Sequence, residues 1–271
     1  MKPAEVYELF WEHPLATDLH VHSTYSDGAG SPDEMVQAAI AQGMTRIGFS
    51  DHSYTAFDLG YSMTPENEPD YRAAVRALAD KYRGQIEVLC GIEQDMYSEP
   101  AWEGYDYLIG SAHYVEVDGE FISVDDTPEI LEAGCAKYFD GDYLALAREY
   151  YRALPGLVER TRPSFVGHFD VVAKFNEKRG YFDESAPAYV EAWKECADAL
   201  LDQGVIFEVN TGAMTRGWRS VAYPAPAMLD YLLERGARFV LSSDSHRVDT
   251  LCAHFPQYFG KLEGAKRGAE R

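Results

Sequence analysis

TDLHVH, residues 17–22, is the stretch from which the fold of this 271-residue chain is inferred. Alternate residues of a β-strand point to the same side, so Asp18, His20 and His22 share one face, while Leu19 and Val21 share the other. Two imidazoles at this spacing can hold one metal ion. Taken alone, the stretch fits equally well a half-buried strand whose polar residues face solvent, and the rest of the chain has to decide between the two.

Six further runs repeat this pattern of a short apolar segment with β-branched residues that ends in polar residues. They are residues 45–52, 86–93, 105–113, 164–170, 205–211 and 238–246. Helical patterns lie between most of them, at residues 31–43, 69–83, 142–161, 185–203 and 224–235. Strands that alternate with helices predict parallel β/α units. Seven such units favour a closed or nearly closed barrel over the alternative, a doubly wound open sheet.

Length and composition fit one domain. Hydrophobic residues make up 46% of the chain and no linker or repeat is visible, so we expect residues 1–271 to form a single domain. Residues 114–141 are long for a connection between a strand and a helix. They predict an excursion over the strand ends, where binding loops belong.

Charge and cysteine content narrow the class of protein. The chain has 45 acidic and 24 basic residues, and a net charge of −21 argues against nucleic acid and anionic membranes as partners. No apolar run approaches the roughly 18–20 residues that span a membrane. The four cysteines lie far apart without a CxxC pair. These features predict a cytoplasmic protein with reduced thiols.

Six of the eight histidines fall at the ends of predicted strands, together with two acidic residues. The set is His20, His22, His52, His113, His168 and His246, with Glu93 and Asp244. The carboxyl ends of barrel strands meet on one face, so we expect these side chains to converge there. Without basic residues between them they would repel or desolvate one another, and divalent cations remove that penalty. The pattern predicts a metal cluster in which Glu93 can bridge two ions.

With these residues in place, the sequence resembles the PHP (polymerase and histidinol phosphatase) superfamily, and within it the histidinol-phosphate phosphatases. The resemblance runs from about Thr17 to Arg247. The motifs that carry it are DLHVHS at 18–23, SDH at 50–52, GIE at 91–93, GSAH at 110–113, GHFD at 167–170 and SDSH at 243–246. The similarity to the histidinol-phosphate phosphatases comes mainly from EVNTGAMTRGWRSVAYPAPAML, residues 208–229.

The resemblance implies a distorted, TIM-like (β/α)7 barrel with three divalent metal ions. Nitrogen and oxygen ligands suit zinc, iron or manganese. Carried onto this sequence, one ion takes His20, His22, Glu93 and Asp244, a second shares Glu93 and adds His113 and His168, and the third takes Asp27, His52 and His246. Many relatives have a histidine near Asp27, and the loop SDGAG differs from that pattern. Asp27 can instead cap the turn at Gly28.

The activity that the resemblance implies is the hydrolysis of L-histidinol phosphate to L-histidinol and phosphate, a step of histidine biosynthesis. Our hypothesis for the reaction is an in-line attack on phosphorus by a hydroxide that bridges two metal ions. The residues expected to take part are His20, His22, Glu93, Asp244 and Arg216. Asp18 and Asp51 are expected to orient ligating imidazoles.

The substrate should also meet charged groups of the protein. The candidates for binding the phosphate are Arg216, Arg247, Lys174 and Arg219, with Arg216 favoured because it lies within the segment 208–229. The ammonium and imidazole of histidinol phosphate would favour an acidic rim, for which Asp95, Asp125, Asp126 and Glu66 are possible sources.

Other functions remain open from the sequence. A PHP exonuclease or proofreading domain is one, although the net charge argues against it. A phosphoesterase for nucleotides or sugar phosphates is another, and a metal-binding protein without turnover is a third. An amidohydrolase-type barrel would also begin with HxH, but it usually needs a metal-bridging lysine, and no strand-end lysine fits. Oligomeric state cannot be read from the sequence.

Overall fold

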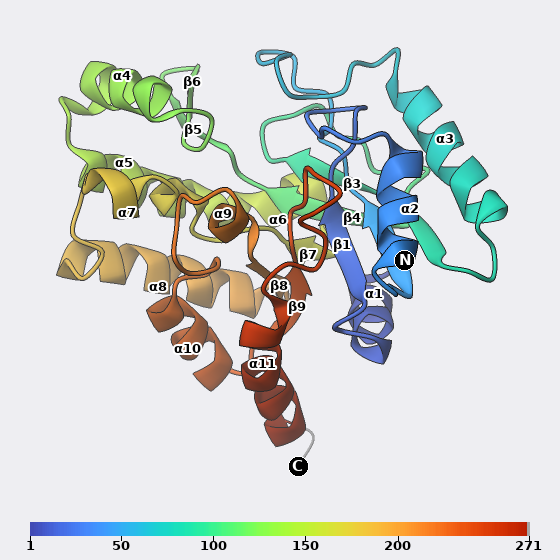
Figure 1. Cartoon of the computed structure of the whole chain (residues 1–271). Helices are drawn as coiled ribbons and strands as arrows, with labels where there is room; N and C mark the ends of the chain where they lie inside the picture. The colour runs from blue at the N-terminus through green and yellow to red at the C-terminus, as the bar shows by residue number, and fades with distance from the viewer. Residues whose placement is uncertain (270–271) are drawn as a thin grey trace.

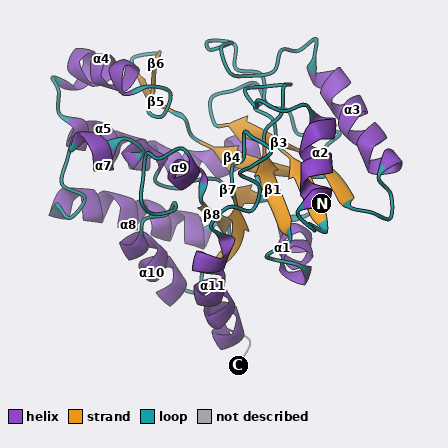
Figure 2. Cartoon of the chain, in the orientation of Figure 1, coloured by secondary structure: helices purple, strands orange, loops and turns teal. Residues whose placement is uncertain are grey.

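The computed structural model describes residues 1–269 and shows a nearly closed barrel of parallel strands with helices around it (Figure 1, Figure 2). In order around the sheet, the strands are β1 (Thr17–Val21), β2 (Arg46–Phe49), β3 (Glu87–Asp95), β4 (Tyr107–Ser111), β7 (Phe165–Val166), β8 (Ile206–Asn210) and β9 (Arg238–Ser242). Each strand is parallel to its neighbours. Because the spatial order follows the chain order without reversal, the predicted (β/α)7 barrel is confirmed and the doubly wound sheet is wrong.

The barrel closes at the carboxyl ends of its first and last strands. The backbone N–H of His22 donates to the carbonyl of Ser245 at 2.9 Å, and the N–H of Ser245 donates to the carbonyl of His20 at 3.1 Å. On the other side of β1, the register with β2 shifts between Asp18 and Val21. The two ends of the sheet therefore meet where the predicted metal ligands lie.

Helices cover the outside of the barrel. They are α1 (Pro3–Glu12), α2 (Pro32–Ala41), α3 (Glu68–Lys81), α4 (Pro128–Phe139), α5 (Tyr143–Ala153), η1 (Leu154–Gly156), α6 (Leu157–Thr161), η2 (Val171–Ala173), α7 (Asn176–Arg179), α8 (Pro187–Asp202), α9 (Gly212–Thr215), α10 (Pro226–Glu234) and α11 (Phe255–Ala269). One hydrophobic cluster joins α2 and α3 to β1–β3, and a larger one joins the remaining strands to the helices around them. No helix within residues 1–269 is long and apolar enough to cross a membrane.

Local sequence explains where α2 begins. Ser31 accepts a hydrogen bond from the backbone of Glu34, whose carboxylate accepts one from the backbone of Ser31 in return, and Pro32 occupies the first helical position. This capping box satisfies backbone groups that the first turn of a helix leaves unpaired.

Several predicted boundaries differ from the structure. The predicted strands 105–113, 164–170 and 238–246 end at Ser111, Val166 and Ser242. Soon after these ends the backbone turns to buried carboxylates, because the N–H groups of His113, His168 and Ser243 donate to Asp95, Glu208 and Asp18 respectively. The predicted helix 142–161 is divided into α5, η1 and α6, where Pro155 has no N–H to donate. The sequence did not predict α11.

The predicted excursion 114–141 forms a separate small unit beside the barrel. It contains an antiparallel hairpin, β5 (Tyr114–Val117) and β6 (Glu120–Ser123), followed by α4. Figure 1 shows the hairpin and α4 together in green, next to α5. The hairpin therefore supplies one wall beside the carboxyl ends of the strands.

A single tyrosine fills much of the barrel interior below these ends. Tyr107 on β4 is fully buried, and its hydroxyl donates to the carbonyls of Leu19 at 2.7 Å and Phe49 at 3.1 Å. Two glycines leave room for the ring, since a Cβ at Gly91 would lie 2.3 Å from Tyr107 Cζ and one at Gly48 would lie 2.4 Å from its hydroxyl oxygen. Tyr107 thus ties β4 to β1 and β2 across the barrel.

We predict that Gly91→Ala destabilises the fold by about 1–3 kcal/mol, the usual cost of an overpacked core. Gly264→Ala is the matched control, because nothing lies within 4 Å of a Cβ at this exposed position in α11. Alanine there should leave stability unchanged or raise it by up to about 1 kcal/mol. Chemical denaturation of both variants measures the difference, and equal stabilities would contradict the packing role of Tyr107.

Candidate metal centre

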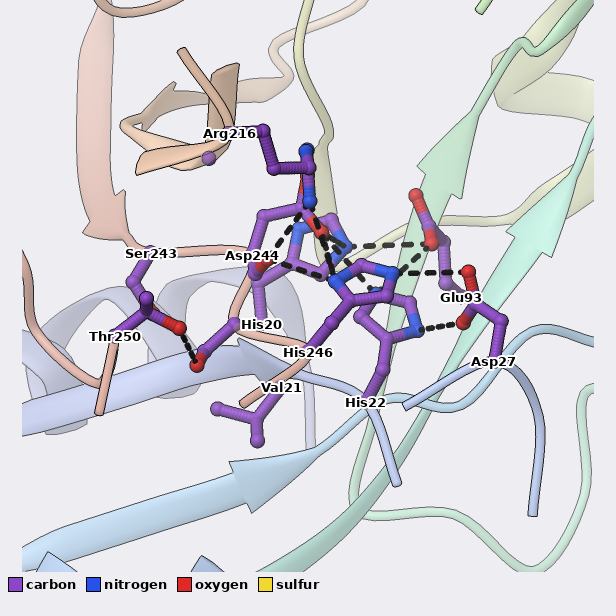
Figure 3. A network of polar contacts seen from close by, with 12 residues as sticks. His20, Val21, His22, Asp27, Glu93, Arg216, Ser243, Asp244, His246 and Thr250 are labelled. Carbon is purple, nitrogen blue, oxygen red and sulfur yellow. Dashed lines mark hydrogen bonds and ion pairs between the residues drawn. The ribbon is translucent and has the colours of Figure 1, made fainter. Parts of the chain in front are cut away.

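Glu93, near the end of β3, is surrounded by imidazoles, and Figure 3 shows it close to His20 and His22. Its side chain is 1% exposed, and its Oε1 lies 2.9 Å from His168 Nε2 and 3.4 Å from His113 Nε2. Its Oε2 lies within 3.5 Å of a ring nitrogen of three further residues, His20, His22 and His52. One carboxylate therefore faces side chains that lie at the carboxyl ends of β1, β2, β4 and β7 or directly after them.

The structure brings all the residues predicted as metal ligands into four overlapping groups. Within each group the donor atoms lie within 4.8 Å of one another. The groups are His20, His22 and Asp244; His20, Glu93 and His168; His52, Glu93 and His113; and His22, Asp27, His52 and His246. They resemble the three predicted ligand sets, except that several members are shared between groups. The assignment of each residue to one ion stays a prediction.

Asp27 takes part in the last of these groups. Its Oδ2 lies 3.0 Å from His246 Nε2, and its Oδ1 lies 3.6 Å from His22 Nδ1 and 3.7 Å from His52 Nε2. The turn at Gly28 is closed by its own backbone N–H, which donates to the carbonyl of Ser23. The Asp27 carboxylate thus faces imidazoles, and the turn at Gly28 is closed by a backbone hydrogen bond and not by the Asp27 side chain.

The donor atoms fit bound cations. His20 Nε2, both ring nitrogens of His22 and Glu93 Oε2 are buried and have no hydrogen-bond partner among the described residues. A buried polar group without a partner costs about 1–3 kcal/mol. Cations between these atoms would take a lone pair from the carboxylate oxygen and from one nitrogen of each neutral imidazole, so the side chains present match the chemistry of a metal cluster.

The protonation states of two candidate ligands also fit metal binding. Burial, together with the nearby rings of His246 and His52, lowers the pKa of His22 to about 3, which keeps this imidazole neutral and able to ligate. Burial would raise the pKa of Asp244, but the Arg216 guanidinium and His20 outweigh it and hold this pKa well below its ordinary value. Asp244 therefore stays ionised at neutral pH.

Two further carboxylates contact the Nδ1 atoms of candidate ligands, on the side of each ring that faces away from Glu93. Glu208 Oε1 on β8 lies 2.6 Å from His20 Nδ1, and Asp95 Oδ2 at the end of β3 lies 3.1 Å from His113 Nδ1. Sequence reasoning assigned no role to Glu208 and considered Asp95 only for the pocket rim. The signal was available, because Glu208 and Asn210 alternate on one face of β8.

Neither Asp18 nor Asp51 contacts an imidazole ring within residues 1–269, although Asp18 accepts from the backbone N–H of His20 at 3.4 Å, so their role in orienting the imidazoles stays a prediction. Asp18 accepts from Ser243, through both backbone and hydroxyl, and from the backbone of Cys252. Asp51 accepts from the backbone and hydroxyl groups of Ser23 and Ser26. Both aspartates hold the loops that carry the candidate ligands.

A cavity of about 340 Å³ opens beside the cluster. Arg216 and Lys174 line it, and Arg216 also donates from Nη2 to Asp244 Oδ2 at 2.8 Å. Asp125 and Asp126 line the same cavity, and Lys174 Nζ lies 3.5 Å from Asp125 Oδ2. Aromatic side chains, among them Tyr61, complete the lining.

Three other candidates for substrate contacts do not line this cavity. Arg219 is buried and donates to Asp170 Oδ2 at 2.9 Å. Arg247 is exposed and paired with Asp249. Glu66 lies outside the lining as well. The structure therefore leaves Arg216 and Lys174 as the cations of the predicted set that face the cavity.

Comparisons with known proteins agree with this geometry. A model of the PHP domain matches residues 18–212. A protein of Deinococcus radiodurans called "Probable histidinol-phosphatase" is 32% identical over 246 residues, which cover 85% of this chain and 86% of that protein.

Solved structures share the fold. One from Listeria monocytogenes has a TM-score of 0.74 at 19% identity and covers 89% of this chain and 99% of its own. A histidinol phosphate phosphatase from Lactococcus lactis, solved with zinc, L-histidinol and phosphate, has a TM-score of 0.65 at 22% identity and covers 92% and 93% of the two chains. On the match to the PHP domain and the similarity to the Deinococcus protein, this chain belongs to the PHP domain family.

Proposed function

We propose that this protein is a metal-dependent phosphomonoesterase that hydrolyses L-histidinol phosphate to L-histidinol and phosphate. The observation that carries the proposal is a ring of candidate ligands around Glu93 that opens into a cavity lined by two cations, Arg216 and Lys174, and by the carboxylates of Asp125 and Asp126. A structural neighbour, the histidinol phosphate phosphatase from Lactococcus lactis, was solved with zinc, L-histidinol and phosphate. The whole chain, residues 1–271, would act as one unit, because the proposed ligands come from β1 through to the loop after β9.

The proposed ligands of a three-ion centre are His20, His22, Asp27, His52, Glu93, His113, His168, Asp244 and His246. Zinc fits these nitrogen and oxygen donors, as do iron and manganese. Divalent ions in such a centre supply a nucleophilic water at neutral pH and neutralise the charge of the phosphate.

The protein's own groups would bind the two ends of the substrate. Arg216 presents a guanidinium to the cavity from a position that also contacts Asp244, so it can bind phosphate oxygens next to the candidate ligands. Lys174 adds a second positive charge at this cavity. Asp126 offers a carboxylate to the ammonium or imidazole of histidinol, since it lines the cavity and forms no ion pair within residues 1–269.

We also propose that the protein works in the cytoplasm. All four cysteines are free thiols, and three of them are buried. This is the usual state in a reducing compartment.

Removal of metal should abolish the release of phosphate from L-histidinol phosphate, and so should His20→Ala. The expected cause is loss of the ions or of one of their ligands, so circular dichroism should still show a folded chain. Metal content and steady-state turnover are measured on the same samples. Turnover that persists after complete removal of metal would sink the proposed mechanism.

Arg216→Lys should raise KM for histidinol phosphate roughly 10-fold, the effect of losing one charged hydrogen bond of about 1.4 kcal/mol. A lysine is a point charge and cannot reproduce the fork of a guanidinium that contacts Asp244 and phosphate together. Arg247→Lys is the matched control, because Arg247 is exposed and paired with Asp249. An equal KM in the two variants would argue against a phosphate contact by Arg216.

Asp126→Asn should reduce the preference for a cationic substrate. KM should rise about two- to fivefold for histidinol phosphate, the size expected of a partly exposed ion pair, and remain unchanged for glycerol phosphate. Glu234→Gln, an exposed change in α10, controls for the loss of one negative charge. A panel with histidinol phosphate, glycerol phosphate, a nucleoside monophosphate and single-stranded DNA makes the comparison, and faster turnover of a nucleotide or of DNA would contradict the proposed substrate.

A further inference from the structure

Glu208 is a fully buried carboxylate on β8 that contacts two of the candidate ligands at once. Its Oε1 lies 2.6 Å from His20 Nδ1 and also accepts from the hydroxyl of Ser242 on β9. Its Oε2 accepts from the backbone N–H of His168 at 2.7 Å and from the side-chain amide of Asn210 at 3.0 Å. Each oxygen thus has one partner in the metal centre and one in the wall of the barrel.

No lysine or arginine among residues 1–269 forms an ion pair with Glu208. Its nearest titratable contact within residues 1–269 is His20, whose Nδ1 lies 2.6 Å from Oε1. A buried carboxylate without compensation costs several kcal/mol. The hydrogen bonds from Ser242, Asn210 and His168 reduce this cost, and the remaining compensation has to come through His20 from the centre itself.

The contact with Glu208 determines which nitrogen of His20 can ligate. An ionised carboxylate only accepts hydrogen bonds, so Nδ1 of His20 carries a hydrogen, and Nε2 is the nitrogen whose lone pair would be offered to a metal ion. Nε2 has no hydrogen-bond partner, and it lies 3.3 Å from Glu93 Oε2 and 3.8 Å from Asp244 Oδ1. Figure 3 shows the His20 ring beside Asp244 and near Glu93.

We propose that Glu208 is a positioning residue of the metal centre, which fixes the tautomer and ring of His20 and the backbone at His168 together. His20 and His168 lie on the two sides of Glu93, since one faces its Oε2 and the other its Oε1. Glu208 would therefore set the geometry of the candidate ligands on both sides of Glu93. The inference rests on the proposed function, because it takes His20 and His168 as ligands.

Asp95 contacts His113 in a similar way but reaches only this one candidate ligand. Its Oδ2 accepts from the backbone N–H of His113 at 2.9 Å and lies 3.1 Å from the ring Nδ1 of the same residue. Glu208 differs because its two oxygens contact two different candidate ligands, His20 and His168, which lie far apart in the sequence.

Glu208→Gln in the full-length, metal-loaded protein tests the proposal. A glutamine side chain has the same shape but only one acceptor oxygen. It can accept from His20 or from His168, and not from both. We expect metal affinity to fall 10- to 100-fold, as for other residues that orient metal ligands. Affinity is read as the chelator concentration that removes half of the bound metal, with metal content measured after gel filtration.

Asp170→Asn is the matched control, because Asp170 is also a fully buried carboxylate but pairs with Arg219 and the backbone of Ala225. This variant should keep the metal affinity of the unchanged protein. The rise in Tm on adding zinc separates positioning from general stability. It should shrink in Glu208→Gln, whereas a purely structural role would lower Tm equally with and without zinc. Unchanged chelator resistance in folded Glu208→Gln would overturn the proposal.

Ser242→Ala keeps the test decisive if Glu208→Gln does not fold. This change removes one hydrogen bond to Glu208 Oε1 and no candidate ligand. Metal retention should weaken in the same direction by a smaller factor, and unchanged retention would overturn the proposal. Turnover of histidinol phosphate is measured on the same samples and tests the proposed function separately. If the unchanged protein retains metal but does not turn over this substrate, the proposed function is contradicted and the role of Glu208 is not.

Discussion

The burial of the Glu93 carboxylate among five imidazoles is the constraint on which the rest of the structure depends. Burial raises the free energy of the ionised group, but the surrounding histidines outweigh this and hold the Glu93 pKa well below its ordinary value. Such a cluster is stable only where rigid elements hold each donor in place. The barrel meets this need, because its parallel strands bring their carboxyl ends to one face and Tyr107 ties β4 to β1 and β2 across the interior.

Buried carboxylates outside the candidate ligand set form the frame around this centre. Asp18 and Asp51 accept hydrogen bonds from loop backbone and hydroxyl groups, and so fix the segments after β9 and β1. Glu208 and Asp95 instead contact imidazoles. Part of the acidity of the chain is therefore internal. These carboxylates are stabilised by local donors and by the histidines, and do not need basic residues on the surface.

The sequence predicted the barrel and the place of the cluster, because both depend on patterns that are local in the chain. Alternation in TDLHVH and polar residues after each apolar run are visible without a structure. The partners of Asp18 were not predictable in this way, since Ser243 and Cys252 follow the last strand of the barrel. Likewise, Arg216 and Arg219 lie in the same segment, 208–229, and the sequence does not distinguish their roles. Only the fold shows that the Arg219 guanidinium donates to Asp170 and does not line the cavity.

Asp27 shows how backbone geometry and ligand chemistry are linked. A carboxylate is shorter than an imidazole, so a loop that presents one to His246 and His22 has to approach them closely. Gly28 permits this approach, because a Cβ at that position would lie 2.6 Å from the backbone of His22 and Ser23. The hydrogen bonds from Ser26 to Asp51 then hold the loop in this position. The choice of aspartate at 27 is therefore coupled to glycine at 28 and to the buried carboxylate at 51, and the three residues act as one feature of the site.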